Sequence, residues 1–160
     1  MPLCPLSDSP FLSLHFRHDR AWRAVESFHQ KRQRIHFLDW ICQSTQIKIA
    51  EASAKIDAAR LIMRSACVNA MEDARRGRIP DMAIKTRYRR DGAFSVNLCT
   101  DAVSMLFAAS GARGLFTTGV LQRQFRDAHA INSHLAFNFD AAGTNYGRVA
   151  LGLPSENLTL

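Results

Sequence analysis

The chain has 160 residues and a net charge of +7, and hydrophobic residues make up 47% of it, close to the average of soluble globular proteins. This composition excludes a disordered, collagen-like or disulfide-scaffold protein, and no apolar run approaches the ~18 residues of a membrane-spanning helix. The basic residues are spread along the chain and interleaved with Asp. We therefore expect neither a nucleic-acid nor a membrane partner, and a nucleic-acid-binding helical protein is an alternative that rests on the basic pI alone.

The cysteines and the N-terminus carry no signal of a metal site or of export. The four cysteines contain no CxxC pair and no spacing typical of metal ligands, so we predict no metal. The first sixteen residues carry three prolines and lack a basic leading region, which is not typical of a signal peptide. We expect a cytoplasmic protein.

Glycine and proline positions divide the chain. Glycine is absent before Gly77, and proline is absent between Pro10 and Pro80, so residues 11–76 contain no helix breaker. We expect an irregular tail over residues 1–18 and one helical domain over residues 19–160. Its first helix is predicted over 19–42, with apolar residues on one face: Trp22, Val25, Phe28, Ile35, Leu38 and Ile41.

Three further helices follow in the predicted order. Residues 44–76 carry a stripe at steps of three and four, formed by Ile47, Ala50, Ala54, Ala58, Leu61, Ser65 and Val68. Residues 81–111 carry another, formed by Phe94, Leu98, Ala102, Met105 and Ala109. Residues 119–142 place Leu121, Phe125, Ala128, Leu135 and Phe139 on their inner side, and Gly143 ends this helix. The chain is thus predicted to be an all-α, up-and-down bundle of about four long helices.

The densest polar and aromatic stretch lies in the last predicted helix. His134 shares a helix face with Phe137 and Asn138, where an imidazole can act as a general acid or base, or is simply a satisfied histidine. His129 is five residues away, so the two histidines do not form an i, i+4 metal pair. We interpret Arg126 and Asp127 as a structural ion pair that joins two helices.

The glycine turn at the end of the third predicted helix is a second candidate site. Gly111 and Gly114 flank Arg113, and close backbone approach beside a guanidinium suits a phosphate. A glycine-rich turn with a solvated arginine is the alternative from the residues alone.

Several ordered motifs resemble a known family. They are Ile56–Leu61, Arg89–Phe94, Ser110–Leu115, Leu121–Ala130 with His134 and Ala136–Asn138, and Gly143-Thr144 with Gly147–Pro154. From about residue 46 onward, the chain resembles the C-terminal helical domain of flavin-dependent monooxygenases with the acyl-CoA dehydrogenase fold. These are the oxygenase components of two-component aromatic hydroxylases.

The resemblance implies a reaction and a set of roles. A separate reductase would supply reduced FMN or FAD, and a C4a-hydroperoxyflavin would hydroxylate a small aromatic substrate. The histidine matching His134 lies beside flavin and substrate in the family, as a base for the phenol or a partner of the peroxide. The residues matching Gly111, Arg113, Gly114, Asn138 and Thr144 are expected to bind the cofactor, with Arg113 reaching a flavin phosphate across a subunit interface. The family assembles as dimers of dimers, so we expect a homo-oligomer, a tetramer.

Two other functions stay open. An acyl-CoA dehydrogenase-like oxidoreductase would need a glutamate base near His134, and no glutamate lies between Asp127 and Gly143. A non-catalytic helical remnant that serves oligomerisation or interaction is the other alternative. It is raised because the family's N-terminal helical and middle β-domains do not fit into residues 1–45, so we expect a truncated homologue or an isolated domain.

Overall fold

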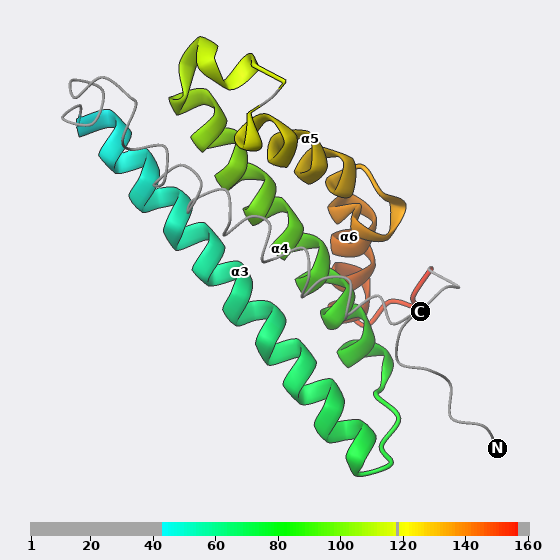
Figure 1. Cartoon of the computed structure of the whole chain (residues 1–160). Coiled ribbons are helices and arrows are strands. Elements are labelled where there is room, and N and C mark those ends of the chain that lie inside the picture. Colours follow the sequence, from blue (N-terminus) through cyan, green and yellow to red (C-terminus); the bar gives the residue numbers. More distant parts are fainter. Residues whose placement is uncertain (1–42, 118, 157–160) are drawn as a thin grey trace, which may run out of the picture.

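The computed structural model describes residues 43–117 and 119–156, and this part of the chain consists of helices joined by short turns, with no strand (Figure 1). The predicted tail over 1–18 and the predicted helix over 19–42 lie outside the described residues. The elements are α3 (Gln43–Arg75), α4 (Met82–Ala109), the 3-10 helix η3 (Gly111–Leu115), α5 (Val120–Asn132), the 3-10 helix η4 (Leu135–Phe137) and α6 (Phe139–Ala150). The predicted all-α class is confirmed.

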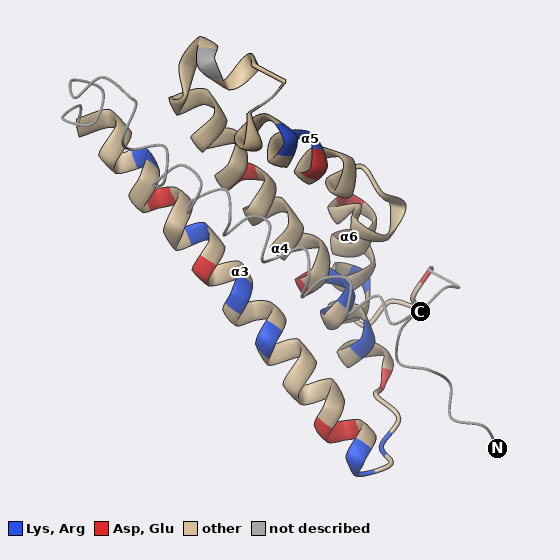
Figure 2. Ribbon diagram, in the orientation of Figure 1, with Lys and Arg blue, Asp and Glu red and all other residues tan. Residues whose placement is uncertain are grey.

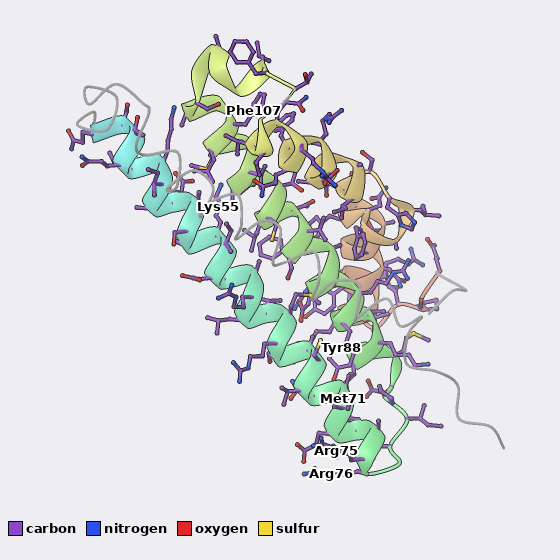
Figure 3. The ribbon with its side chains drawn as sticks, viewed as in Figure 1. Lys55, Met71, Arg75, Arg76, Tyr88 and Phe107 are labelled. Atoms are coloured by element: carbon purple, nitrogen blue, oxygen red, sulfur yellow. The ribbon has the colours of Figure 1, made fainter. Side chains whose placement is uncertain are left out.

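The long helices α3 and α4 run antiparallel, side by side (Figure 1). The predicted end of α3 and both predicted bounds of α4 are confirmed to within two residues. Arg75 and Arg76 mark the end of α3 (Figure 3), and Gly77 follows with a φ of 65°, a left-handed conformation that glycine adopts without strain. Asp81 caps α4, because its side chain accepts a hydrogen bond from the backbone N–H of Ile84 at 2.8 Å.

α4 is the central helix of the described fold, because α3, α5 and α6 each pack against it. Its length and apolar composition alone would allow it to cross a membrane. Here it is the core helix instead, and its fully buried Val103 and Leu106 lie in one cluster with Ile56 of α3 and Leu121 of α5.

The face of α3 that packs on α4 is not the stripe that the periodicity singled out. The buried residues are Ala52, Ile56, Ala59, Met63 and Ala66. In the predicted stripe, Ile47, Leu61 and Val68 are 56%, 68% and 55% exposed. Both stripes have helical period and many small residues, so periodicity alone cannot choose between them. The choice is made by the fit of Ile56 and Met63 against α4.

The surface of the helix pair is polar and mixed in charge. Figure 2 shows acidic and basic residues interleaved along α3. Lys55 lies between two carboxylates, 3.3 Å from Glu51 on its own helix and 3.7 Å from Asp101 on α4. Such exposed pairs contribute little to stability, and they offer no concentrated field that would attract a polyanion.

The single helix predicted over 119–142 is wrong. The chain leaves helical conformation at Ser133, forms η4, and starts α6 at Phe139. Polar side chains cause the break, since the hydroxyl of Ser133 donates to the carbonyl of His129 and Asn138 caps the next helix. Leu135, predicted to face inward, is therefore 80% exposed. Gly143 does not end a helix but lies inside α6.

The last described residues fold back along α6. The buried amide of Asn145 accepts hydrogen bonds from the Ser155 hydroxyl at 3.0 Å and from the Glu156 backbone N–H at 3.3 Å. Arg148 donates to the carbonyl of Pro154 at 3.2 Å and lies 2.9 Å from the carboxylate of Glu156. These contacts hold residues 154–156 against the helix.

Candidate functional site

His134 stands at the junction between α5 and α6, outside any regular helix. Its backbone is extended, and its Nδ1 accepts a hydrogen bond from the backbone N–H of Ala136 at 3.1 Å, so the imidazole caps η4. The ring lies 6.1 Å from the buried ring of Phe137. Because Nδ1 is the acceptor, the proton of the neutral imidazole sits on Nε2, and the exposed ring can donate from that atom.

Asn138 is the second side chain that shapes this junction. Its Oδ1 accepts a hydrogen bond from the backbone N–H of Ala141 at 3.1 Å and so caps α6. Asp140 lies in the first turn of α6, where its negative carboxylate interacts favourably with the positive end of the helix dipole. The two caps set the direction in which α6 returns onto α4.

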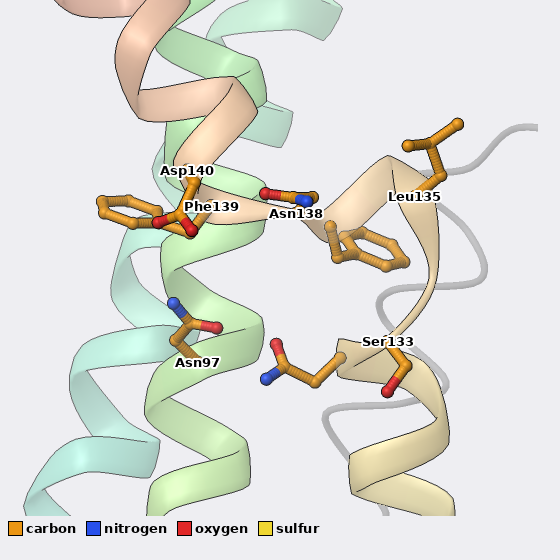
Figure 4. A pocket seen from close by; sticks show the side chains of 8 residues that line it. Asn97, Ser133, Leu135, Asn138, Phe139 and Asp140 are labelled. Atoms are coloured by element: carbon orange, nitrogen blue, oxygen red, sulfur yellow. The ribbon is translucent and has the colours of Figure 1, made fainter.

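A polar groove of about 370 Å³ opens beside this junction (Figure 4). The side chains around it come from three helices: Asn97 from α4, Asn132 from α5, and Asn138 and Asp140 from the α6 end. Its other lining residues are Ser133, Leu135, Phe137 and Phe139. Three carboxamides and a carboxylate can exchange hydrogen bonds with a polar planar ligand, and the apolar groups can contact its face.

Sequence reasoning missed Asn97 and Asn132 as groove residues. Asn97 lies in the middle of α4, and nothing in its sequence surroundings tells that the α5–α6 junction folds onto it. Thr144, predicted to bind the cofactor, is exposed on α6 and does not line the groove. The structure thus brings Asn138 to the groove and leaves Thr144 outside it, and His134 is adjacent to the lining residues Ser133 and Leu135 without lining the groove itself.

The glycine turn has a structural reason for each of its glycines. Gly111 ends α4 with a φ of 59°, and open space surrounds its Cα, since nothing lies within 4 Å of a Cβ built there. Gly114 is buried, and a Cβ on it would meet the hydroxyl of Ser110, which donates to the carbonyl of Phe107. Arg113 lies between them in η3, where its backbone alone is described.

Two buried carboxamide oxygens in the following helix lack a hydrogen-bond partner among the described residues. They are Oε1 of Gln122 and Oε1 of Gln124, near the start of α5. Buried polar atoms in folded proteins are normally paired, so these two acceptors leave room for a donor from outside the described chain. Gly111 leaves its backbone open to a ligand, and the two acceptors could take a hydrogen bond from a hydroxyl or N–H group of a ligand, but not from a phosphate, which is itself an acceptor.

The two halves of the predicted site do not meet within one chain. Asn97 borders the groove, whereas Gly111 follows the end of the same helix, 14 positions later. At about 1.5 Å per residue, the separation along the axis is about 21 Å. In Figure 1 the turn of η3 lies at the far end of α4, away from α6.

His129 forms a different arrangement from His134. Its Nε2 lies 3.0 Å from the hydroxyl of Ser104 on α4, and its ring packs on Phe125 with centroids 4.3 Å apart. The hydroxyl proton of Ser104 is donated to the carbonyl of Thr100, so the oxygen accepts from His129. This hydrogen bond connects α5 to α4. Because His129 donates to Ser104, it cannot act as the base that would activate Ser104 as a nucleophile.

The remaining candidate groups are structural. Asp127 lies 3.9 Å from Arg123 on its own helix, an i, i+4 pair, and the predicted ion pair of Arg126 and Asp127 stays a prediction. Burial raises the pKa of Cys99 to about 11 and also raises that of Cys67, so both side chains are thiols at neutral pH.

Oxygenase components of known flavin hydroxylases are similar to this chain in sequence. The chain is 37% identical over 112 residues to the oxygenase component of an FADH(2)-dependent resorcinol hydroxylase of a Rhizobium strain, matching 68% of this chain and 27% of that protein. It is 28% identical over 141 residues to the oxygenase component of p-hydroxyphenylacetate 3-hydroxylase of Acinetobacter baumannii, matching 85% of this chain and 33% of that protein. The chain therefore spans about a third or less of these relatives.

Solved structures show the same fold. The 3-HSA hydroxylase of Rhodococcus sp. RHA1 superposes with a TM-score of 0.78 at 27% identity, over 88% of this chain and 36% of that one. XiaF from a Streptomyces species, solved in complex with FADH2 and glycerol, superposes with a TM-score of 0.86 over 94% of this chain and 39% of that one. At 20% identity, the second likeness shows the fold alone.

The family match extends over most of the chain. The model of the acyl-CoA dehydrogenase C-terminal domain matches residues 19–139, which include α3, α4, α5 and the α5–α6 junction. Together with the helical architecture and the relatives above, this match shows that the chain belongs to the acyl-CoA dehydrogenase C-terminal domain family, in its flavin-dependent oxygenase branch.

Proposed function

We propose that this chain is the C-terminal helical part of the oxygenase component of a two-component flavin hydroxylase. It would take part in hydroxylating a small aromatic compound with reduced FMN or FAD supplied by a separate reductase. The observation that carries the proposal is the position of His134, which caps η4 beside a polar groove lined by three carboxamides. The named activities of the resorcinol and p-hydroxyphenylacetate relatives support the same substrate class.

The tautomer of His134 favours one of the two roles that the family resemblance implies. With Nδ1 occupied by the Ala136 N–H, neutral His134 presents an N–H at Nε2 to a ligand. It would therefore donate a hydrogen bond to an oxygen of flavin or substrate, and abstraction of a phenolic proton by Nδ1 would first require the loss of the cap. Flavin, when bound, supplies the oxygen-activating chemistry.

The glycine turn would serve the phosphate of a flavin. Gly111 allows close backbone approach, and Arg113 brings a positive charge. The acceptors of Gln122 and Gln124, in the helix that follows, would take hydrogen bonds from hydroxyl or N–H groups of the flavin and not from its phosphate. Since this turn and the His134 groove are about 21 Å apart along α4, we infer that they act on different flavin molecules in an assembly of chains. A homo-oligomer, a tetramer, would bring the turn of one copy to the groove of another.

Anaerobic titration of the chain with reduced FMN and reduced FAD tests the binding half of the proposal. We expect saturable binding that Arg113→Ala weakens about ten- to a hundredfold, since a charge-assisted hydrogen bond contributes roughly 1.5–3 kcal/mol. Arg123→Ala, at an arginine that is 74% exposed on α5, is the matched control and should leave affinity unchanged. Equal affinity of the two variants would contradict the role of Arg113.

Product formation with a flavin reductase, using resorcinol and p-hydroxyphenylacetate as substrates, tests the catalytic half. We expect His134→Asn to lower hydroxylation by about 10²–10³-fold, because a hydrogen-bond donor positioned on an oxygen of the reacting groups contributes on this scale. It should also raise the peroxide released per reduced flavin consumed. His129→Asn, which removes the bond to Ser104, is the control and should hydroxylate at close to the wild-type rate. Equal rates in both variants would show that the site is wrongly assigned.

A non-catalytic remnant is the second candidate function. The observation that favours it is the length of the match, because the chain aligns with only 27% and 33% of the length of the resorcinol and p-hydroxyphenylacetate relatives. The flavin titration separates the two proposals, since a remnant kept for interaction alone would show no affinity for reduced or oxidised flavin at high micromolar concentration.

A further inference from the structure

The polar groove beside the α5–α6 junction carries a negative charge that no lining residue offsets. Asp140 is the one charged side chain among the eight described residues that line it, and none of them is a lysine or arginine. Asp140 also forms no ion pair with any residue that the structure describes. A chain with a net charge of +7 therefore presents an acidic site at this position.

Two arginines of α4 belong to a different cavity. That cavity has a volume of about 590 Å³, lies between α3 and α4, and shares only Phe139 with the groove. Arg90 donates from Nε to the carboxylate of Asp91 at 2.9 Å, and Arg87 lies 3.6 Å from the same carboxylate. The guanidinium of Arg90 also lies 4.1 Å from the centre of the Tyr146 ring. Both arginines are therefore held by other partners, and neither lines the groove.

The start of α6 would attract an anion if it were open, because the first N–H groups of a helix and the helix dipole carry positive charge there. Side chains of the protein itself occupy this position. Asn138 accepts a hydrogen bond from the backbone N–H of Ala141 at 3.1 Å, and Asp140 lies in the first turn. A ligand carboxylate at this end of the groove would meet the carboxylate of Asp140, and like charges repel.

The other lining groups suit a neutral aromatic ligand with polar substituents. The carboxamides of Asn97, Asn132 and Asn138 can each donate and accept, whereas the carboxylate of Asp140 only accepts. Figure 4 shows Asp140 and Asn138 at one end of the groove and Asn97 at the other. Its volume of about 370 Å³ lies near the lower end of the roughly 300–1,000 Å³ of small-molecule sites, so one aromatic ring with its substituents fits.

We propose that this groove selects neutral phenols over phenols that carry a carboxylate, and that Asp140 determines the preference. The inference rests on the proposed function, because it names the substrate class of the same site. A neutral phenol with a second hydroxyl or an amide group can donate a hydrogen bond to Asp140. An anionic substituent is repelled by Asp140 and leaves water without gaining a cation. The preference acts on binding, so it is measurable without flavin.

A pair of ligands of nearly equal size separates charge from shape. p-Hydroxyphenylacetamide is neutral, and p-hydroxyphenylacetate carries a carboxylate. In titration calorimetry of the full chain, we expect the amide to bind about tenfold more tightly than the acid, because repulsion and the unpaired ligand charge both act against the acid. Asp140→Asn should reduce this ratio about three- to tenfold, as expected for one charge at a solvent-exposed position. A ratio that Asp140→Asn leaves unchanged would overturn the proposal.

Two further variants test whether the position of the charge matters. Asp101→Asn is the matched control, because it removes the same charge from an exposed carboxylate that lies 3.7 Å from Lys55 of α3, and it should leave the ratio unchanged. Asn97→Asp places a second carboxylate at the other end of the groove and should widen the preference for the amide. Circular dichroism verifies that each variant keeps its helix content. Equal binding of the amide and the acid by the wild type, or binding of neither, would also overturn the proposal.

Hydroxylation assays with a flavin reductase separate this proposal from the proposed function. A chain that binds reduced flavin and hydroxylates both compounds with equal kcat/KM would support the proposed function and contradict the role of Asp140. A chain that prefers the amide through Asp140 but binds no flavin would support the charge selection by the groove and contradict the proposed function.

Discussion

The glycine turn and the His134 junction both interrupt the helical chain, but they do so by different means. At the turn, backbone geometry requires the residues present, since Gly111 has a positive φ and Gly114 has no room for a Cβ. At the junction, side chains make the break, through the caps of His134 and Asn138. Asparagine is among the preferred capping residues and histidine is not. The fold alone therefore explains why Gly111 and Gly114 are glycines. It does not explain why residue 134 is a histidine, and we attribute that choice to function.

The largest stability effect should come from Gly114→Ala. The new Cβ would displace the hydroxyl of Ser110 and press on Phe107, so we expect the free energy of unfolding to fall by roughly 1–3 kcal/mol, as in other overpacked sites. Urea denaturation measures the change. Gly92→Ala, inside α4 with nothing within 4 Å, should instead stabilise by about 0.5–1 kcal/mol. Equal effects at both positions would remove the structural explanation of the turn.

Alkaline pH should weaken the part of α4 that connects the two regions. Burial raises the pKa of Cys99 from 9.0 to about 11, so the folded chain holds this proton when the unfolded chain has released it. The stabilisation by the protonated thiol is complete below pH 9 and is lost as pH rises through about 11, and the total loss is about 3 kcal/mol. Denaturation of the wild type and of Cys99→Ala at pH 8, 9 and 10 measures it. A parallel decline in both proteins would assign the loss to other groups.

Removal of the α6 cap should cost less. Asn138→Ala leaves the backbone N–H of Ala141 without its side-chain acceptor, and we expect a loss of about 1 kcal/mol in the free energy of unfolding. Asn138→Asp keeps an acceptor oxygen and should restore stability. If the aspartate variant were as unstable as the alanine variant, the cap would not be the reason for the break at the junction.

The smallest stability effect should come from His134→Asn. Asparagine can accept the same hydrogen bond from Ala136, so we expect a change of a few tenths of a kcal/mol in thermal denaturation. Set beside the large loss of hydroxylation proposed for the same variant, this result would separate the capping role of His134 from its chemical role. A loss of more than about 1 kcal/mol would mean that the histidine is kept for structure.

The sequence predicts the long helices well because their signals are local. Gly77 and Pro80 end α3, and Asp81 starts α4 through its own side chain. The break after Asn132 was missed because apolar spacing continues through Leu135 and Phe139, while the caps that interrupt it act over two or three residues. Asn97 was missed for a different reason, since its place at the groove depends on how α6 folds back onto α4.

The central position of α4 has a consequence for how the chain folds during synthesis. α3 packs against α4, which is the next helix in the sequence. α5 and then α6 follow in the chain, and each packs against α4 as well. Contacts between neighbouring helices close short loops, which favours rapid folding. Once residues up to Ala109 have emerged from the ribosome, the complete α3–α4 hairpin can form. The surface on which α5 and α6 pack is therefore already present when these helices emerge.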